Sequence, residues 1–126
     1  MKNIMVCVTQ QRNCERLIQF GYNTLGEQQG ELFVVHVTGK QYKFLGHAKD
    51  SDALEYLFEI AGQYGANLTV LRSDDILSTL VEQVKKNEIT QIIMGEPGKE
   101  SGQSDTIISR LADRVSDQAE IIVVPA

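Results

Sequence analysis

The chain has 126 residues, a formal net charge of −5, 42% hydrophobic residues and 23% charged residues. This length fits one domain, 1–126, and the composition is that of a globular protein rather than of a disordered one. The acidic balance and the scattered basic residues argue against nucleic-acid binding, which needs a basic face to replace phosphate counterions.

Nothing in the sequence marks export or membrane insertion. No apolar run approaches the ~18–20 residues that span a bilayer. The run Ile4–Val8 is too short for a signal peptide and has no cleavage region, so the expected location is the cytoplasm. Cys7 and Cys14 are expected to be buried thiols, because disulfides are rare in the cytosol and a zinc site needs more ligands.

Short apolar runs alternate with segments whose apolar residues recur at helical spacing. In chain order, the strands are expected at Ile4–Val8, Leu32–Val37, Leu68–Leu71, Gln91–Met94 and Ile121–Val124. The four helices between them are recognised by apolar stripes that run from Cys14 to Leu25, from Leu54 to Ala61, from Leu77 to Val84 and from Ile108 to Val115. Residues 50–52 offer a cap for the second helix, and the fourth helix is free to start before Ile108.

This alternation predicts an α/β fold, in which a five-stranded parallel sheet carries helices on both faces. The expected strand order is 3-2-1-4-5, which reverses direction between strands 1 and 4. Ligands of open α/β sheets bind at such a reversal, outside the carboxyl ends of the strands. Two loops meet there, 9–13 after the first strand and 95–106 after the fourth, and a binding site is expected between them.

The second loop has the composition of an anion site. It offers glycine N–H groups, hydroxyls and the start of a helix, with Lys99 nearby. In the competing interpretation it is a solvated turn whose Ser104 only caps the helix. The candidate ligand-binding residues are Thr9, Gln10, Arg12, Val37, Gly95, Gly98, Ser101, Gly102, Ser104, Thr106 and Ser109.

Other polar and aromatic residues have simpler interpretations. Asp74 and Asp75 are expected to cap the third helix rather than to bind a metal, since no third ligand is close in sequence. His36, flanked by valines, is expected to be a hydrogen-bonded core histidine. Two interpretations of the second connection stay open: its aromatic and apolar residues pack on the sheet, or they cover a base. These residues are Tyr42, Phe44 and Leu45, whereas His47 in the same connection is expected to be exposed.

Several segments together resemble the universal stress protein family over nearly the whole chain. They are Val6–Thr9 with Cys14–Leu17, Gly30–Val37, Leu54–Phe58, Thr69–Asp75 and Gly95–Pro97. The resemblance implies a Rossmann-like fold of the adenine nucleotide alpha hydrolase type. Within the family, the sequence is most similar to the stress-protein domain of KdpD, the potassium-responsive sensor histidine kinase, as a free-standing version or a fragment. No kinase segment is present.

The resemblance implies an adenine nucleotide ligand. Two departures from the family's sequence pattern affect which nucleotide is expected. ATP-binding members carry the loop G-x-x-G-x₉-G-[ST], of which Gly95, Gly98 and Ser109 match, whereas Ile108 replaces the third glycine. The aspartate that usually ends the first strand is replaced by Thr9, or by Gln10 if the alignment moves by one. Both departures disfavour ordinary ATP binding, and the similarity to KdpD implies cyclic di-AMP as a further candidate beside ATP and AMP.

Three classes of function follow. The first is a ligand-binding sensor with no required cofactor or metal, whose signal a sensor kinase or transporter would receive. The second is a ligand-free scaffold, because an apolar last strand at a sheet edge invites pairing, and the resemblance implies a homodimer through Ile121, Ile122, Val123 and Val124. The third is an enzyme, which is disfavoured because the sequence lacks established catalytic motifs and an evident general base.

Overall fold

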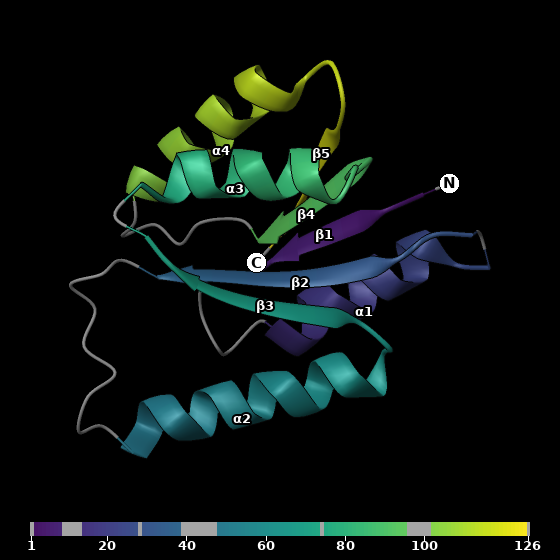
Figure 1. The fold of residues 1–126 in the computed structure, drawn as a ribbon, viewed down its shortest axis with the longest axis vertical. Coiled ribbons are helices and arrows are strands. Elements are labelled where there is room, and N and C mark those ends of the chain that lie inside the picture. Colours follow the sequence, from purple (N-terminus) through teal and green to yellow (C-terminus); the bar gives the residue numbers. More distant parts are fainter. Residues whose placement is uncertain are drawn as a thin grey trace.

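The computed structural model describes residues 2–8, 14–27, 29–38, 48–73, 75–95 and 102–125. Strands and helices alternate through these residues (Figure 1). In chain order they are β1 (Ile4–Cys7), α1 (Cys14–Leu25), β2 (Leu32–Thr38), α2 (Ala48–Gln63), β3 (Asn67–Arg72), α3 (Ile76–Lys86), β4 (Gln91–Gly95), α4 (Gly102–Val115) and β5 (Glu120–Val124).

The strands form one parallel sheet in the order β3-β2-β1-β4-β5, which confirms the order expected from the sequence. β1 lies at the centre, where Ile4 is opposite Leu32 of β2 and Gln91 of β4. The chain therefore leaves β1 first toward β3 and, after α3, returns to the other side of β1. This return creates the predicted reversal between β1 and β4.

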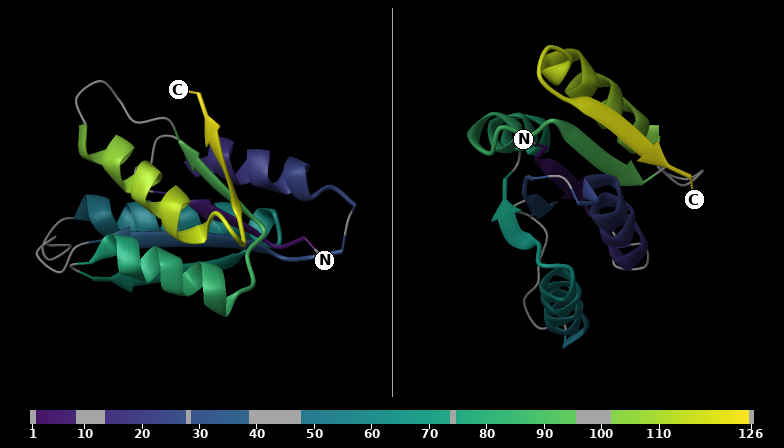
Figure 2. Two further views of the ribbon diagram at one scale, coloured as in Figure 1. Left: turned by 90° about the horizontal axis from the view of Figure 1, so that it is seen from above. Right: turned by 90° about the vertical axis from the view of Figure 1, so that its right-hand side faces the viewer.

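Two helix layers cover the sheet, with α1 and α2 on one face and α3 and α4 on the other (Figures 1 and 2). Alternate residues of β1 contribute to the two cores, because successive strand side chains point to opposite faces. Ile4 and Val6 pack with α1 and α2, whereas Met5 and Cys7 pack with α3 and α4. Burial on both faces explains why the first strand is a continuous apolar run.

A buried asparagine fixes the amino edge of the three central strands. Asn3 is 7% exposed, and its side-chain amide donates to the carbonyl oxygens of Asn87, at 3.3 Å, and Glu88, at 3.1 Å. Its side-chain oxygen accepts the N–H of Glu31 at 3.1 Å. The backbone N–H of Asn3 donates to the hydroxyl of Thr90 at 3.1 Å. One residue thus joins the segments that enter β1, β2 and β4.

The same edge requires a glycine. A Cβ atom added to Gly30 would lie 1.5 Å from the carbonyl oxygen of Lys2, which is far inside van der Waals contact. The backbone there approaches closely because the N–H of Lys2 donates to the carbonyl of Gln29, and the N–H of Ile4 donates to that of Glu31. Gly30 therefore permits the approach of the segments before β1 and β2.

Two helices begin earlier than the apolar stripes predicted. α2 begins at Ala48, ahead of the stripe that starts at Leu54 and of the expected cap at 50–52, and α4 begins at Gly102, ahead of the stripe that starts at Ile108. The added turns are mostly polar, so periodicity does not mark them. The expected loop 95–106 is shortened, because Gly102, Ser104 and Thr106 belong to α4. Ser104, the expected cap, is the third residue of the helix.

We expect Asn3→Ala to lower the free energy of unfolding by about 2–3 kcal/mol, because it leaves three partly buried backbone groups without their partner. Urea denaturation of the purified protein measures this loss. The matched control is Asn23→Ala, since Asn23 is exposed on α1 and its replacement should change stability little. Equal midpoints for the two variants would show that Asn3 does not stabilise the amino edge.

Candidate functional site

The carboxyl edge between β1 and β4 collects the starts of two helices. Cys7 of β1 is paired with Met94 of β4, and β4 ends at Gly95. α1 follows β1 and α4 follows β4, and both helices begin on the side to which the strand arrows point (Figure 1). Helix N-termini carry unpaired N–H groups and partial positive charge, so this edge suits an anion.

The structure describes six of the predicted ligand-binding residues. Gly95 ends β4, Val37 lies in β2, and the other four, Gly102, Ser104, Thr106 and Ser109, lie along the first part of α4. Ser109 is exposed. The remaining five lie outside the described residues, and their assignment stays a prediction: Thr9, Gln10, Arg12, Gly98 and Ser101.

Val37 and Gly95 differ in what they can offer. The side chain of Val37 is 8% exposed and belongs to the core beneath α3 and α4, so little of it remains for a ligand. A Cβ atom added to Gly95 would lie 3.4 Å from Leu17 of α1. The end of β4 therefore passes close to α1. Gly95 thus lies beside the helix that follows β1 and just before the helix that follows β4.

A histidine and a cysteine near this edge have structural roles. The Nδ1 atom of His36 lies 2.7 Å from the carbonyl oxygen of Val8, which confirms the predicted hydrogen-bonded histidine, although it is half-buried. Cys7 is buried, as predicted, and burial raises the pKa of its thiol to about 12. A thiol with this pKa is a poor nucleophile and metal ligand. The side chain of Cys14 lies outside the described residues.

Sequence reasoning missed Arg16, in the first turn of α1. Its guanidinium donates to the carbonyl of Pro125, directly after β5. Beside it, Glu15 accepts a hydrogen bond from the hydroxyl of Tyr56 of α2 at 3.0 Å. The first turn of α1 is therefore held from both sides, and Arg16 adds an exposed cation next to loop 9–13. The position of Arg16 shortly after loop 9–13 in the sequence could have indicated it as a candidate site residue.

No cluster of three or more potential metal ligands occurs among the residues that the structure describes. Asp75 caps α3, as predicted: its carboxylate accepts the N–H of Ser78 at 3.0 Å and the hydroxyl of Ser78 at 2.8 Å. These hydrogen bonds lower the pKa of the Asp75 carboxyl. Asp74, Tyr42, Phe44, Leu45 and His47 lie outside the described residues.

The helices provide no membrane anchor in the part of the chain that is described. None of them combines the length and the apolar character that crossing a bilayer requires.

Comparisons with known proteins agree with this geometry. The model of the universal stress protein family matches residues 1–124. A search of curated proteins finds no match. Among solved structures, the hypothetical protein MJ0577 has a TM-score of 0.71 at 13% identity, with 99% of this chain and 96% of that chain covered.

Two further structures contain nucleotides. A universal stress protein from Archaeoglobus fulgidus, in complex with dAMP, has a TM-score of 0.67 at 16% identity, with coverage of 98% of this chain and 97% of that one. A universal stress protein in complex with cAMP has a TM-score of 0.66 at 14% identity, with coverage of 98% and 96%. These likenesses establish that the fold is shared.

We expect Cys7 to resist thiol reagents in the native protein. Relative to its ordinary pKa of 9.0, a value of about 12 lowers the thiolate fraction near pH 8 by about a thousandfold. Reaction with dithionitrobenzoate should therefore be slow in the native Cys14→Ser variant, which retains only Cys7, and fast in urea. Rapid native reaction would contradict the burial of Cys7.

Because the unfolded thiol ionises above about pH 9 while the folded thiol keeps its proton, the free energy of unfolding should fall as the pH rises above about 9.

Proposed function

Because the chain belongs to the universal stress protein family, we propose that it binds an adenine nucleotide at the carboxyl ends of β1 and β4 and acts as a sensor. The observation that carries this proposal is the meeting of two helix starts, those of α1 and α4, beside Gly95 at the reversal of the sheet. Related structures that contain dAMP and cAMP support the class of ligand.

In this proposal the phosphate binds where the chain passes from β4 into α4. Gly98 and Ser101 offer backbone and hydroxyl groups, and the N-terminus of α4 at Gly102 favours negative charge. Arg16 in the first turn of α1 and Arg12, which comes before that helix in the sequence, would supply cations. We assign the base to the backbone at Val37 of β2 and to Thr9 and Gln10, which follow β1 in the sequence.

The start of α4 favours nucleotides with few phosphates. Ile108, which replaces the third glycine of the ATP loop, lies well inside α4, half-buried against the core. The glycine-containing loop is therefore cut short by helix, and less backbone remains to surround a triphosphate. We propose AMP, a cyclic mononucleotide or cyclic di-AMP as ligand rather than ATP. The resemblance to the KdpD domain that the sequence suggests is the ground on which we also propose cyclic di-AMP and a link to potassium homeostasis, with a sensor kinase or transporter as the receiver.

We propose binding without catalysis. Among the described residues at this edge, His36 is hydrogen-bonded to the backbone and burial raises the pKa of Cys7 far above neutrality. Neither group forms a nucleophile–base pair of the kind that hydrolysis requires.

A homodimer through β5 is the second part of the proposal, and it is also the basis of the alternative function, a ligand-free scaffold. Within the described part of the chain, β5 is an edge strand whose one partner is β4. Val123 is 42% exposed, and Ile121 and Ile122 are half-buried, whereas Val124 is buried in the core. An exposed apolar edge of this kind favours pairing with a second copy.

We expect the preferred nucleotide to raise the thermal stability of the protein. At a ligand concentration of about 100 Kd, the free energy of unfolding should rise by about 2.7 kcal/mol. A thermal-shift titration with AMP, cAMP, cyclic di-AMP and ATP measures this effect. Gly98→Val should abolish the shift, because its side chain would block the close approach of phosphate to the backbone.

The control for this titration is Gly62→Ala on α2, where an added Cβ atom has no neighbour within 4 Å; it should leave the shift unchanged. Flat curves for all four nucleotides would contradict the sensor and leave the scaffold. An equal shift in Gly98→Val would place the ligand elsewhere.

We expect Val123→Lys to weaken the homodimer by about 30-fold or more, because it places a charge in an apolar contact. Sedimentation equilibrium measures the dissociation constant. Val70→Lys is the matched control: Val70 lies in β3 at the other sheet edge and is 40% exposed, close to the 42% of Val123. If Val70→Lys alone produced monomers, the interface would lie at β3.

A further inference from the structure

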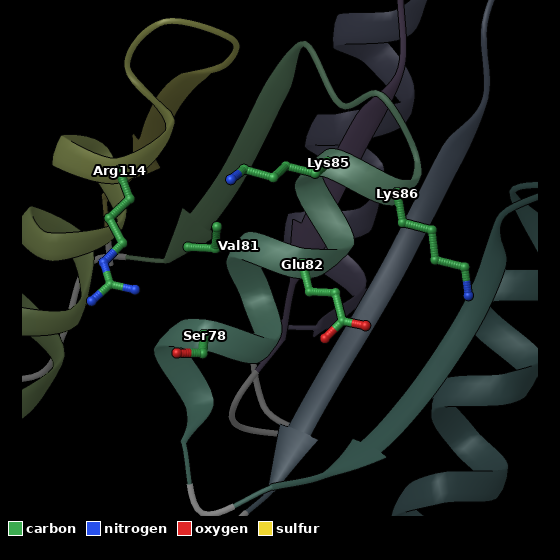
Figure 3. Close-up of a pocket in the computed structure, with 6 residues that line it drawn as sticks. All are labelled: Ser78, Val81, Glu82, Lys85, Lys86 and Arg114. Carbon is green, nitrogen blue, oxygen red and sulfur yellow. The ribbon is translucent and has the colours of Figure 1, made fainter.

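A surface groove runs between α3 and α4, on the face of the molecule that these two helices cover (Figure 3). Its volume is about 500 Å³. Five of its lining residues come from α3 and one from α4. They are Ser78, Val81, Glu82, Lys85, Lys86 and Arg114, and we call this set the α3/α4 groove.

The groove is basic in an otherwise acidic chain. Three cations, Lys85, Lys86 and Arg114, line it against the single carboxylate of Glu82, whereas the whole chain has a net charge of −5. None of these cations forms an ion pair within the part of the chain that the structure describes, although Arg114 acts electrostatically on Asp75, the cap of α3, and helps to lower the pKa of its carboxyl. The charges of Lys85 and Lys86 are therefore available to an external acidic group, whereas that of Arg114 is shared with Asp75.

The directions of the side chains indicate the shape of the occupant. In Figure 3, Lys85 extends from α3 toward the α4 side, above Val81, and Lys86 extends to the opposite side, over β2 and β3. Arg114 lies across the groove on α4. Because the two lysines diverge and Glu82 lies between them, the cations cannot converge on one compact phosphate.

Spaced acidic side chains with an apolar residue between them fit this arrangement better. Val81 is the one apolar residue of the lining; it packs against the core but is only half-buried, so part of its side chain is exposed between Lys85 and Arg114 and forms the apolar floor. A groove between two helices that combines an apolar floor with flanking charge is suited to an amphipathic segment of another protein. Electrostatic complementarity would select an acidic one.

We propose that the α3/α4 groove is a docking site for an acidic amphipathic segment of a partner protein. A domain that senses a ligand without catalysis must transmit its signal through a surface. α4, which forms one wall, begins at the edge where the ligand is proposed to bind. The role of docking in signalling rests on the proposed sensor function. Docking of the segment does not require a bound nucleotide, so the experiment is done without one.

The test measures binding of a fluorescein-labelled synthetic peptide of about 14 residues, with leucines at i, i+3, i+4 and i+7 and glutamates elsewhere. Fluorescence anisotropy with the 126-residue chain should show saturable binding that weakens with added salt. Lys85→Glu should weaken binding about tenfold, and Arg114→Gln should weaken it by a smaller factor. A peptide with lysines in place of the glutamates should not bind.

A matched control separates the groove from the net charge. Lys85→Glu changes the net charge by −2, and so does the double variant Gln19→Glu/Gln63→Glu, whose residues are exposed on α1 and α2. The double variant should bind the peptide as the unmodified protein does, and circular dichroism should show that all variants are folded. Equal weakening by the control, or no saturable binding, would overturn the proposal.

Two further outcomes would assign the groove to another occupant and overturn the proposal. If inorganic polyphosphate displaced the labelled peptide when its concentration of negative charges equals that of the peptide, the groove would be a general anion site. Self-association that persists in Val123→Lys and disappears with Lys85→Glu would indicate a second copy. The exposed face of α2 would then be the natural candidate, since it carries Glu55, Glu59 and Phe58, which is 70% exposed.

Discussion

Complete burial of β1 between two helix layers is the constraint on which the rest of the structure depends. All four residues of the strand are buried, and each has a neighbour on both sides, in β2 and in β4. A strand in this position must be apolar on both faces, and its register sets that of both halves of the sheet. Asn3 fixes this register through hydrogen bonds to the segments that enter β2 and β4.

The stabilising contacts and the candidate binding site thereby lie at opposite ends of the strands. At the amino edge, hydrogen bonds of Asn3 and Thr90 join neighbouring backbone segments, and the close approach at Gly30 leaves no space for a larger side chain. The carboxyl edge carries Gly95 and the starts of α1 and α4. Parallel strands make this separation possible, because all of them end on the same side, and every crossover helix begins there. A ligand at that edge would contact helix starts without disturbing the register.

The general position of the candidate site followed from the sequence, but its details did not. Strand order and the glycines at 95 and 98 indicated the reversal between the first and fourth strands. The first residue of α4 was left open, because the helix begins with mostly polar residues ahead of its apolar stripe. Arg16 was missed because its contact with Pro125 joins residues that are 109 positions apart. The α3/α4 groove likewise depends on how two helices pack against each other, which a local sequence pattern does not predict.

The sequence by itself determined which segments form strands and helices, the cap at Asp75 and the burial of Cys7. These features depend on spacings of two to four residues, which hydrophobic periodicity and capping chemistry reveal directly. Only the tertiary structure decided that Asn3 is buried and joins three strands, and that Lys85 and Arg114 line one groove. Such contacts join residues far apart in the chain, and they exist only when sheet register and helix packing have been fixed together.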